Sequence, residues 1–254
     1  MSHPTGMASR PSEAIEDYAK AIYSLCRQGD GTATTNALAE RLGVTPASVS
    51  AMVKKLDERG LVRHVRYKGV ALTPDGERVA LEVMRHHRLL ETYLAEHLGV
   101  PWDRVHEEAE ALEHVLSEYL EAKIAAKLGH PTHDPHGDPI PSVDLEILEE
   151  DSTRLSALEP GDRGTFVRVS DSDPEMLRYL TERGVRLGDV FDVLERQPFG
   201  GPLSVRFGEK VHALGGALAA AMRVELEGRA PGRATGGPRS SAQPGARGRR
   251  RAPR

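Results

Sequence analysis

The sequence predicts a mainly α-helical protein with a small β domain at its C-terminal end. Three observations lead to this expectation: the first half has apolar residues at helical spacing, Thr-Pro pairs mark helix starts, and residues 159–226 contain alternating apolar and polar runs. A chain of 254 residues has room for several small domains rather than one large core. We expect four segments, covering residues 1–73, 74–142, 143–227 and 228–254.

The first segment is expected to contain three helices and a hairpin. Gly43 ends the second helix, and Thr45-Pro46 supplies an N-cap followed by a proline at the first position of the third helix. Alternating residues around a Lys68-Gly69 turn favour two paired strands. The expected helices cover residues 12–28, 35–42 and 46–59, and the hairpin covers 61–72.

The second segment is expected to form a helical hairpin. Thr73-Pro74 begins a long helix that reaches about His97, and a second helix of similar length lies between Pro101 and about Leu128. Because only a few residues separate the two, they should pack side by side. Residues 129–142 hold too many Pro and Gly residues for regular structure and are expected to be a linker.

The remaining chain divides into a small barrel and a basic tail. Three alternating runs and one short helix after Asp173-Pro174 fit a small barrel within residues 143–227. Residues 228–254 hold eight Arg and no acid, so the rest of the chain is more acidic than the net charge of −4 suggests. The tail is expected to be disordered. Phosphate contacts and a solubilising role remain equal alternatives for it.

The two short helices around Gly43-Val44 have the layout of a helix-turn-helix, with the hairpin as a basic wing. Small and hydroxylated residues let the start of the second helix approach base edges, while basic side chains reach phosphates. A three-helix protein module is the alternative. The expected DNA-binding residues are Thr45, Pro46, Ala47, Ser48, Ser50, Lys54, Arg63, Arg66 and Lys68.

Bulk properties and missing motifs exclude several classes. The sequence has no apolar run long enough to span a membrane and no secretory signal, so we expect a cytoplasmic protein without a membrane partner. Cys26, the single cysteine, cannot build a thiolate zinc site, so His, Asp and Glu must hold any metal. His106-Glu107 begins like a zinc-protease motif, but Glu110 replaces the second His. A metal-dependent hydrolase is therefore only a distant alternative, and no small organic substrate is expected.

Residues 105–114 are the strongest candidate for a metal site. At 3.6 residues per turn, one stripe of this helix carries His106, Glu110, Glu113 and His114. The preceding helix carries His87 and Glu91 at the i, i+4 spacing, and a hairpin would bring both stripes together. A divalent cation would relieve the repulsion among these carboxylates. The spacing alone leaves a solvated acidic face as an open alternative.

These residues resemble a known family. The helix-turn-helix, the basic wing, the run Arg85–Glu91 and the run Val105–His114 resemble the diphtheria toxin repressor family of iron- and manganese-dependent repressors. The resemblance covers roughly residues 12 to 227. It implies a winged helix-turn-helix domain, a helical domain that dimerises and binds metal, and a C-terminal SH3-like (FeoA-like) barrel. It also implies a homodimer bound to double-stranded operator DNA.

The resemblance implies a primary site made by Asp17, Glu110, Glu113 and His114. Iron-responsive members have Met and Cys where this sequence has Asp17 and Glu110, whereas manganese-responsive members have Asp and Glu. Oxygen donors suit Mn²⁺, so the expected function is a manganese-dependent repressor of metal-uptake genes. An iron-dependent repressor that uses Fe²⁺ is the alternative.

One position departs from the pattern. Manganese regulators with a dinuclear centre have Glu where this sequence has Lys20, and a cation cannot be a ligand. Longer members use an ancillary site instead. Its expected donors here are His87, Glu91, His106, Asp134, His136 and Asp173. Met176 stands where iron repressors have Gln, and a solvated connector remains the alternative for the linker residues.

Overall fold

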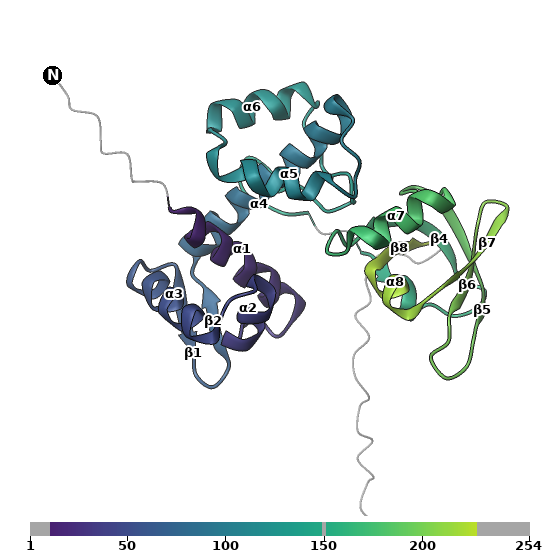
Figure 1. The fold of residues 1–254 in the computed structure, drawn as a ribbon, viewed down its shortest axis with the longest axis horizontal. Helices are drawn as coiled ribbons and strands as arrows, with labels where there is room; N and C mark the ends of the chain where they lie inside the picture. Colours follow the sequence, from purple (N-terminus) through teal and green to yellow (C-terminus); the bar gives the residue numbers. More distant parts are fainter. Residues whose placement is uncertain (1–10, 149–150, 228–254) are drawn as a thin grey trace, which may run out of the picture.

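The computed structural model describes residues 11–148 and 151–227, which form three bodies along the chain (Figure 1). In the first body, three helices surround a two-stranded antiparallel hairpin. Thr34 and Thr45 cap α2 and α3 by accepting hydrogen bonds from Ala37 N and Ser48 N, each over 3.2 Å. The elements are α1 (Glu13–Gln28), α2 (Thr35–Leu42), α3 (Pro46–Glu58), β1 (Val62–Val65) and β2 (Gly69–Leu72). All five expected elements are therefore present.

The second body is built on α4 (Pro74–Leu98), which runs from the hairpin into the helical domain (Figure 1). The single long helix expected between Pro101 and Leu128 is wrong. It is broken into α5 (Val105–Leu112), the 3₁₀ turn η1 (Glu113–Val115) and α6 (Glu118–Lys127). Leu116 is extended and buried, and Ser117 caps α6 by accepting a hydrogen bond from Leu120 N over 3.3 Å. Burial of Leu116 together with this cap explains the break.

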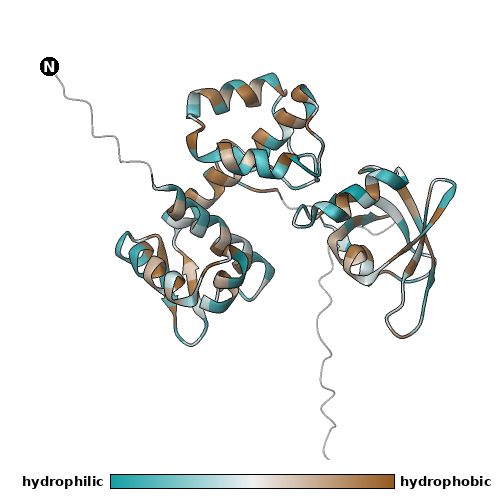
Figure 2. Cartoon of the chain, in the orientation of Figure 1, coloured by the Kyte–Doolittle hydropathy of each residue, from teal (hydrophilic) through white to brown (hydrophobic). Residues whose placement is uncertain are grey.

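An apolar groove lies on the second body. It has a volume of about 550 Å³, and its walls come from α4, the end of α5, η1 and α6. Several large apolar side chains around it are exposed, including Leu98, Leu112, Val115 and Leu120. Figure 2 shows hydrophobic and hydrophilic stretches alternating along these helices. Such a contiguous apolar surface is typical of a face that a partner covers.

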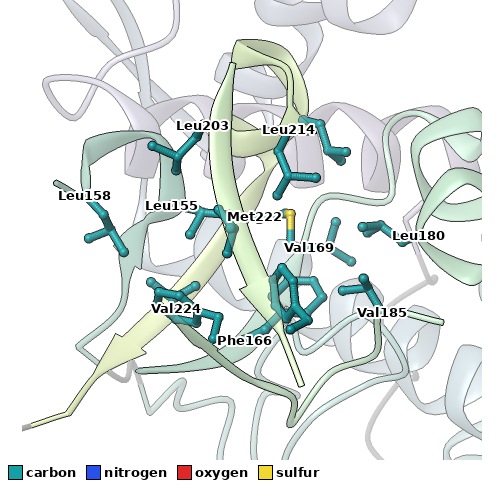
Figure 3. Packing of buried hydrophobic residues seen from close by; sticks show 14 of the residues in the cluster. Leu155, Leu158, Phe166, Val169, Leu180, Val185, Leu203, Leu214, Met222 and Val224 are labelled. Carbon is teal, nitrogen blue, oxygen red and sulfur yellow. The ribbon is translucent and has the colours of Figure 1, made fainter. Parts of the chain in front are cut away.

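The linker and the barrel follow. Residues 129–142 form turns with one isolated bridge between His133 and Pro139, as expected for a connector. The third body is a six-stranded antiparallel sheet of order β3-β8-β4-β5-β6-β7, with buried Phe166, Met222 and Val224 in its core (Figure 3). Its elements are β3 (Thr153–Arg154), the 3₁₀ turn η2 (Leu155–Ala157), β4 (Arg163–Val169), α7 (Pro174–Arg183), β5 (Val190–Arg196), β6 (Leu203–Phe207), β7 (Lys210–Leu214), α8 (Gly216–Ala221) and β8 (Met222–Leu226).

The three expected strands and the helix after Asp173-Pro174 are β4, β5, β6 and α7. The small barrel is therefore confirmed, although sequence alternation did not single out β7, α8 or β8. The basic tail lies outside the described residues. Within the described ranges, no helix is long and apolar enough to cross a membrane.

Candidate metal centre and DNA-binding surface

A first group of ligand-type side chains, here called the primary cluster, lies between α1 and η1. Asp17 comes from α1, Glu113 and His114 come from η1, and one ligand atom of each lies within 4.8 Å of the others. His114 Nε2 is 3.0 Å from Asp17 Oδ1 and 3.4 Å from Glu113 Oε1. The fold thus brings three of the four predicted primary ligands together. The primary cluster therefore contains side chains from both the first and the second body.

The donor atoms of the primary cluster fit a divalent cation. Asp17 Oδ1 is buried, and within the described part of the chain it has an ion-pair contact with His114 at 3.0 Å but makes no hydrogen bond. Burial raises the pKa of Asp17, although the charges of His114 and Lys20 oppose the shift. Glu16 Oε2 lies 2.7 Å from His114 Nδ1, and this contact leaves Nε2 facing the cluster. A second carboxylate behind a ligand imidazole is a common feature of metal sites.

Glu110, the fourth predicted ligand, pairs with Lys20 and is not part of the group formed by Asp17, Glu113 and His114. Lys20 Nζ donates to Glu110 Oε2 over 2.8 Å and to Glu113 Oε1 over 2.5 Å. Burial alone would lower the pKa of Lys20, but the two carboxylates outweigh it and raise the pKa. The ring of His87 contacts Glu113 Oε2, so both oxygens of Glu113 have a cationic or potentially cationic neighbour.

A second group, here called the ancillary cluster, combines His87, Glu91, His106 and Asp171. His87 Nε2 is 3.1 Å from Glu91 Oε1 and 3.1 Å from His106 Nδ1. His106 Nδ1 is 3.0 Å from Asp171 Oδ2. The four donors come from α4, α5 and the loop before α7, so the ancillary cluster joins the helical body to the barrel.

Asp171 occupies the place in this cluster that the sequence analysis gave to Asp173. Asp173 instead caps α7, where its Oδ1 accepts a hydrogen bond from Glu175 N over 2.9 Å. An Asp directly before a Pro is a strong N-cap signal, which could have excluded Asp173 as a ligand. Asp171, two residues earlier, keeps its carboxylate free to face His106.

The two predicted linker donors also lie beside Glu91. Glu91, Asp134 and His136 form a buried group whose ligand atoms lie within 4.8 Å. His136 Nε2 donates to the Trp102 carbonyl over 2.7 Å, and this bond directs Nδ1 toward Glu91 Oε1 at 3.7 Å. In the described part of the chain, the buried Nδ1 has no hydrogen-bond partner. Asp134 Oδ1 accepts backbone hydrogen bonds from His136 and Asp138, so it shapes the linker turn.

The histidines of the ancillary cluster have raised pKa values because they face carboxylates. Burial would lower the pKa of His87, but hydrogen bonds to Glu113 and Glu91 raise it to about 9. The carboxylates of Asp171 and Glu91 raise the pKa of His106 to about 10. Burial would raise the pKa of Glu91, but the surrounding imidazoles lower it well below its usual value. A divalent cation bound there would replace these protons.

The predicted DNA-binding side chains all lie exposed on α3 or on the β1–β2 hairpin. The Thr45 and Ser48 hydroxyls are 3.0 Å apart, and Ser50 Oγ donates to the Pro46 carbonyl over 2.9 Å. Lys68 pairs with Asp30 over 2.8 Å, which ties the wing to the loop between α1 and α2. The sequence analysis missed Tyr67, which lies 90% exposed at the wing tip with Arg66 Nη2 donating to its hydroxyl over 2.8 Å.

Comparisons with protein families cover each of the three bodies. Residues 11–70 match the N-terminal DNA-binding domain of iron-dependent repressors, residues 73–142 match their metal-binding and dimerisation domain, and residues 153–226 match the FeoA domain. The iron-dependent repressor IdeR of Mycobacterium tuberculosis is 33% identical over 84% of this chain and 97% of its own length. The diphtheria toxin repressor of Corynebacterium diphtheriae is 33% identical over 71% of this chain and 75% of its own length.

This chain belongs to the diphtheria toxin repressor family. It is a metal-dependent transcriptional regulator rather than an enzyme, because its matching domains and relatives are those of repressors. Solved structures agree with this assignment. A manganese-dependent transcriptional repressor in complex with manganese is 43% identical and has a TM-score of 0.79 over 84% of this chain and 99% of its own. The manganese regulator SloR is 32% identical, with a TM-score of 0.70 over 84% and 98%.

Proposed function

We propose that this repressor is activated by Mn²⁺ and acts in the cytoplasm on the operators of metal-uptake genes. One observation carries the proposal: Asp17, from the DNA-binding body, faces Glu113 and His114 of the helical body across 4.8 Å or less. An ion held by all three would fix the DNA-binding domain to the helical domain. DNA affinity would rise because both recognition helices of a dimer must match the spacing of one DNA helical repeat.

The donor chemistry supports manganese. The proposed primary ligands Asp17, Glu110, Glu113 and His114 offer carboxylate oxygens and one imidazole nitrogen, with no sulfur. Hard oxygen donors suit Mn²⁺, whereas thiolate and thioether donors suit softer ions. The matching structures that were solved as manganese-dependent repressors support the same choice.

Iron is the second candidate, and one observation favours it. Two relatives that this chain matches over 97% of their length are named as iron-dependent repressors. At a site of this kind affinity rises from Mn²⁺ to Fe²⁺, so discrimination must come from geometry and from the ions that the cell supplies. The experiment below therefore compares both ions directly.

We propose a second ion at the ancillary cluster, held by His87, Glu91, His106 and Asp171, with His136 as a further donor. The buried Nδ1 of His136 supports this role because it makes no hydrogen bond within the described residues and lies 3.7 Å from Glu91 Oε1, so its lone pair would be available to a cation beside Glu91. Burial, together with the charges of Asp138 and Glu91, raises the pKa of Asp134 to about 8. Burial is the larger cause of this shift, and the neighbouring carboxylates of Asp138 and Glu91 add negative charge that an ion would relieve.

The apolar groove of the helical body supports a homodimer. Its exposed leucines and Val115 lie in the domain that matches the family's metal-binding and dimerisation domain. A second copy would cover them. Dimerisation would also place two copies of α3 and of the wing on one face, for adjacent major grooves of operator DNA.

The test is a DNA-binding titration with Mn²⁺, with Fe²⁺ under anaerobic conditions, with Zn²⁺ and without added metal. The probe is a labelled duplex that the protein itself selects from random sequences in the presence of Mn²⁺. We expect binding that saturates with Mn²⁺ and is at least about tenfold weaker without metal. Equal affinity with and without metal would contradict the proposal, and stronger activation by anaerobic Fe²⁺ would favour the iron candidate.

A further inference from the structure

Lys20 has an unusual position for a lysine in a metal-binding protein. Its Nζ donates to Glu110 and Glu113 over 2.8 and 2.5 Å, and the Lys20 side chain is only 20% exposed. Glu113 is fully buried, so this pair differs from the surface ion pairs that contribute little. Both of its acidic partners are proposed ligands of the primary cluster.

The ammonium group links two bodies of the fold. Lys20 lies on α1, one turn after Asp17, whereas Glu110 lies in the last turn of α5 and Glu113 begins η1. The ammonium group of Lys20, from the DNA-binding body, therefore forms ion pairs with Glu110 and Glu113 of the helical body without any metal. The same α1 turn supplies both the cation and the proposed metal ligand Asp17.

Charge counting shows what this arrangement does to an incoming ion. Asp17, Glu110 and Glu113 carry three negative charges. One divalent ion would supply two positive charges and the Lys20 ammonium a third, while the ring of His87 contacts the other oxygen of Glu113. The ammonium also competes with the ion, because it uses Glu113 Oε1, the oxygen that lies 3.4 Å from His114 Nε2. Two cations that share one carboxylate oxygen repel each other strongly in a partly buried site.

We propose that Lys20 is an internal cation that competes with the activating metal for Glu110 and Glu113 and so sets the metal affinity of the primary cluster. In the metal-free protein it prevents repulsion between these carboxylates. When the metal binds, the Lys20 ammonium gives up its hydrogen bond to Glu113 Oε1, and its positive charge continues to offset the negative charge of the carboxylates. This inference rests on the proposed metal site, and it assigns to Lys20 a role in tuning affinity rather than in ligation.

The test replaces Lys20 with Met, whose unbranched side chain is similar in length and has no charge. Titration calorimetry with Mn²⁺ uses the full chain carrying His106→Asn and Asp171→Asn, which removes two ancillary donors and leaves every primary donor in place. In this background, Lys20→Met should bind Mn²⁺ about tenfold more tightly or better, because a competing positive charge is gone. Lys20→Arg should bind with nearly the parent affinity.

Thermal melting separates this role from a purely structural one. Without metal, Lys20→Met should melt at a lower temperature than its parent, and saturating Mn²⁺ should remove most of that difference. A structural lysine would lower the melting temperature in both states and would weaken Mn²⁺ binding. Lys210→Met is the surface control, because Lys210 lies exposed on β7, which supplies no residue to either cluster.

The outcomes separate a failure of the primary metal site from a failure of the role assigned to Lys20. If the parent with Lys20 in place binds no Mn²⁺, the primary metal site itself is wrong, and the Lys20 role is overturned with it. If the parent binds Mn²⁺ but Lys20→Met binds it with equal or lower affinity, only the role of Lys20 is overturned. Tighter binding by Lys20→Met, with parent-like binding by Lys20→Arg, supports the proposal.

Discussion

On the proposed function, the donor atoms of a few side chains decide which ion the primary cluster accepts. Asp17 Oδ1 is buried beside His114. Glu110 pairs with Lys20, which also donates a hydrogen bond to Glu113 of the primary cluster. Both positions offer hard, anionic oxygen. The choice of ion therefore depends on a few donor atoms, whereas the surrounding fold is shared with iron- and manganese-dependent relatives alike.

Changing these donors should change the selectivity. The double substitution Asp17→Met and Glu110→Cys replaces two carboxylates with a thioether and a thiol. It should reduce activation by Mn²⁺ more than activation by Fe²⁺, because sulfur donors suit the softer ion. DNA-binding titrations with each ion under anaerobic conditions measure the ratio. An equal loss for both ions would show that these two positions do not set selectivity.

The histidine protons predict how stability depends on pH in the metal-free protein. The pKa of His87 is raised from 6.5 to about 9 by Glu113 and Glu91, so its charged form stabilises the fold. This stabilisation is complete below pH 6.5 and is lost as the pH rises through about 9. The melting temperature should fall by roughly 5 °C between these values.

A His87→Gln variant is the control for this pH dependence and should show a smaller fall, since its side chain does not titrate. Melting curves recorded with excess chelator at pH 6.5 and pH 9 provide the measurement. A melting temperature that stays constant or increases over this interval in the unsubstituted chain would contradict the assigned role of the His87 proton.

At the scale of secondary-structure elements, the proposed contact with DNA is made by the short helix α3 and the wing of the DNA-binding domain. The start of α3 is exposed and free of acidic side chains through Met52, so it can approach a groove. Ser48→Glu together with Ser50→Glu should place two negative charges against the phosphates and abolish operator binding. Calorimetry should find Mn²⁺ binding unchanged, because both positions lie away from the metal clusters. Operator affinity that stays the same would move the DNA surface elsewhere.

The groove formed by α4, α5 and α6 makes a prediction about assembly. Leu120 is 49% exposed on α6 at the groove wall. Leu120→Glu should favour the monomer, because a carboxylate would be buried without a partner when a second copy covers the groove. Sedimentation velocity should show the loss of a dimer, whereas Lys127→Glu, at the same wall but already charged, should have a weaker effect. A dimer that persists in Leu120→Glu would place the interface elsewhere.

Some helices and strands could be predicted from the sequence and others could not. Helices with clear caps, such as α2 and α3 after Thr34 and Thr45, were predicted nearly to the residue because capping is a local interaction. The break at Leu116 was missed because burial of that side chain depends on neighbours from other helices. Strands β7 and β8 were missed because their pairing depends on long-range partners.

For the whole molecule, the candidate site could be predicted by residue type but not by arrangement. Helical periodicity put His106 and Glu110 on one stripe, yet His106 faces Asp171 in the ancillary cluster and Glu110 faces Lys20. No local pattern reveals that Asp17 meets His114, since 97 positions of chain, folded into two bodies, separate them. That contact came from the family resemblance and from the fold.

For the molecule as a whole, we propose that one ion couples metal sensing to DNA binding by bridging the DNA-binding body and the helical body. Asp17 is the only side chain of the primary cluster that belongs to the DNA-binding body. Glu110, Glu113 and His114 would remain in Asp17→Ala, so that variant should still bind Mn²⁺ with reduced affinity. Its response to the ion should nevertheless be lost, because the ion would no longer hold α1.

The most direct measurement is therefore the gain in operator affinity that saturating Mn²⁺ produces in Asp17→Ala, compared with the unsubstituted chain. Fluorescence anisotropy follows DNA binding, and calorimetry on the same samples establishes that the ion is bound. We predict that Mn²⁺ increases operator affinity at least about tenfold in the unsubstituted chain and hardly at all in Asp17→Ala. A full Mn²⁺-dependent gain in Asp17→Ala would show that the bridge through Asp17 does not couple the two sites.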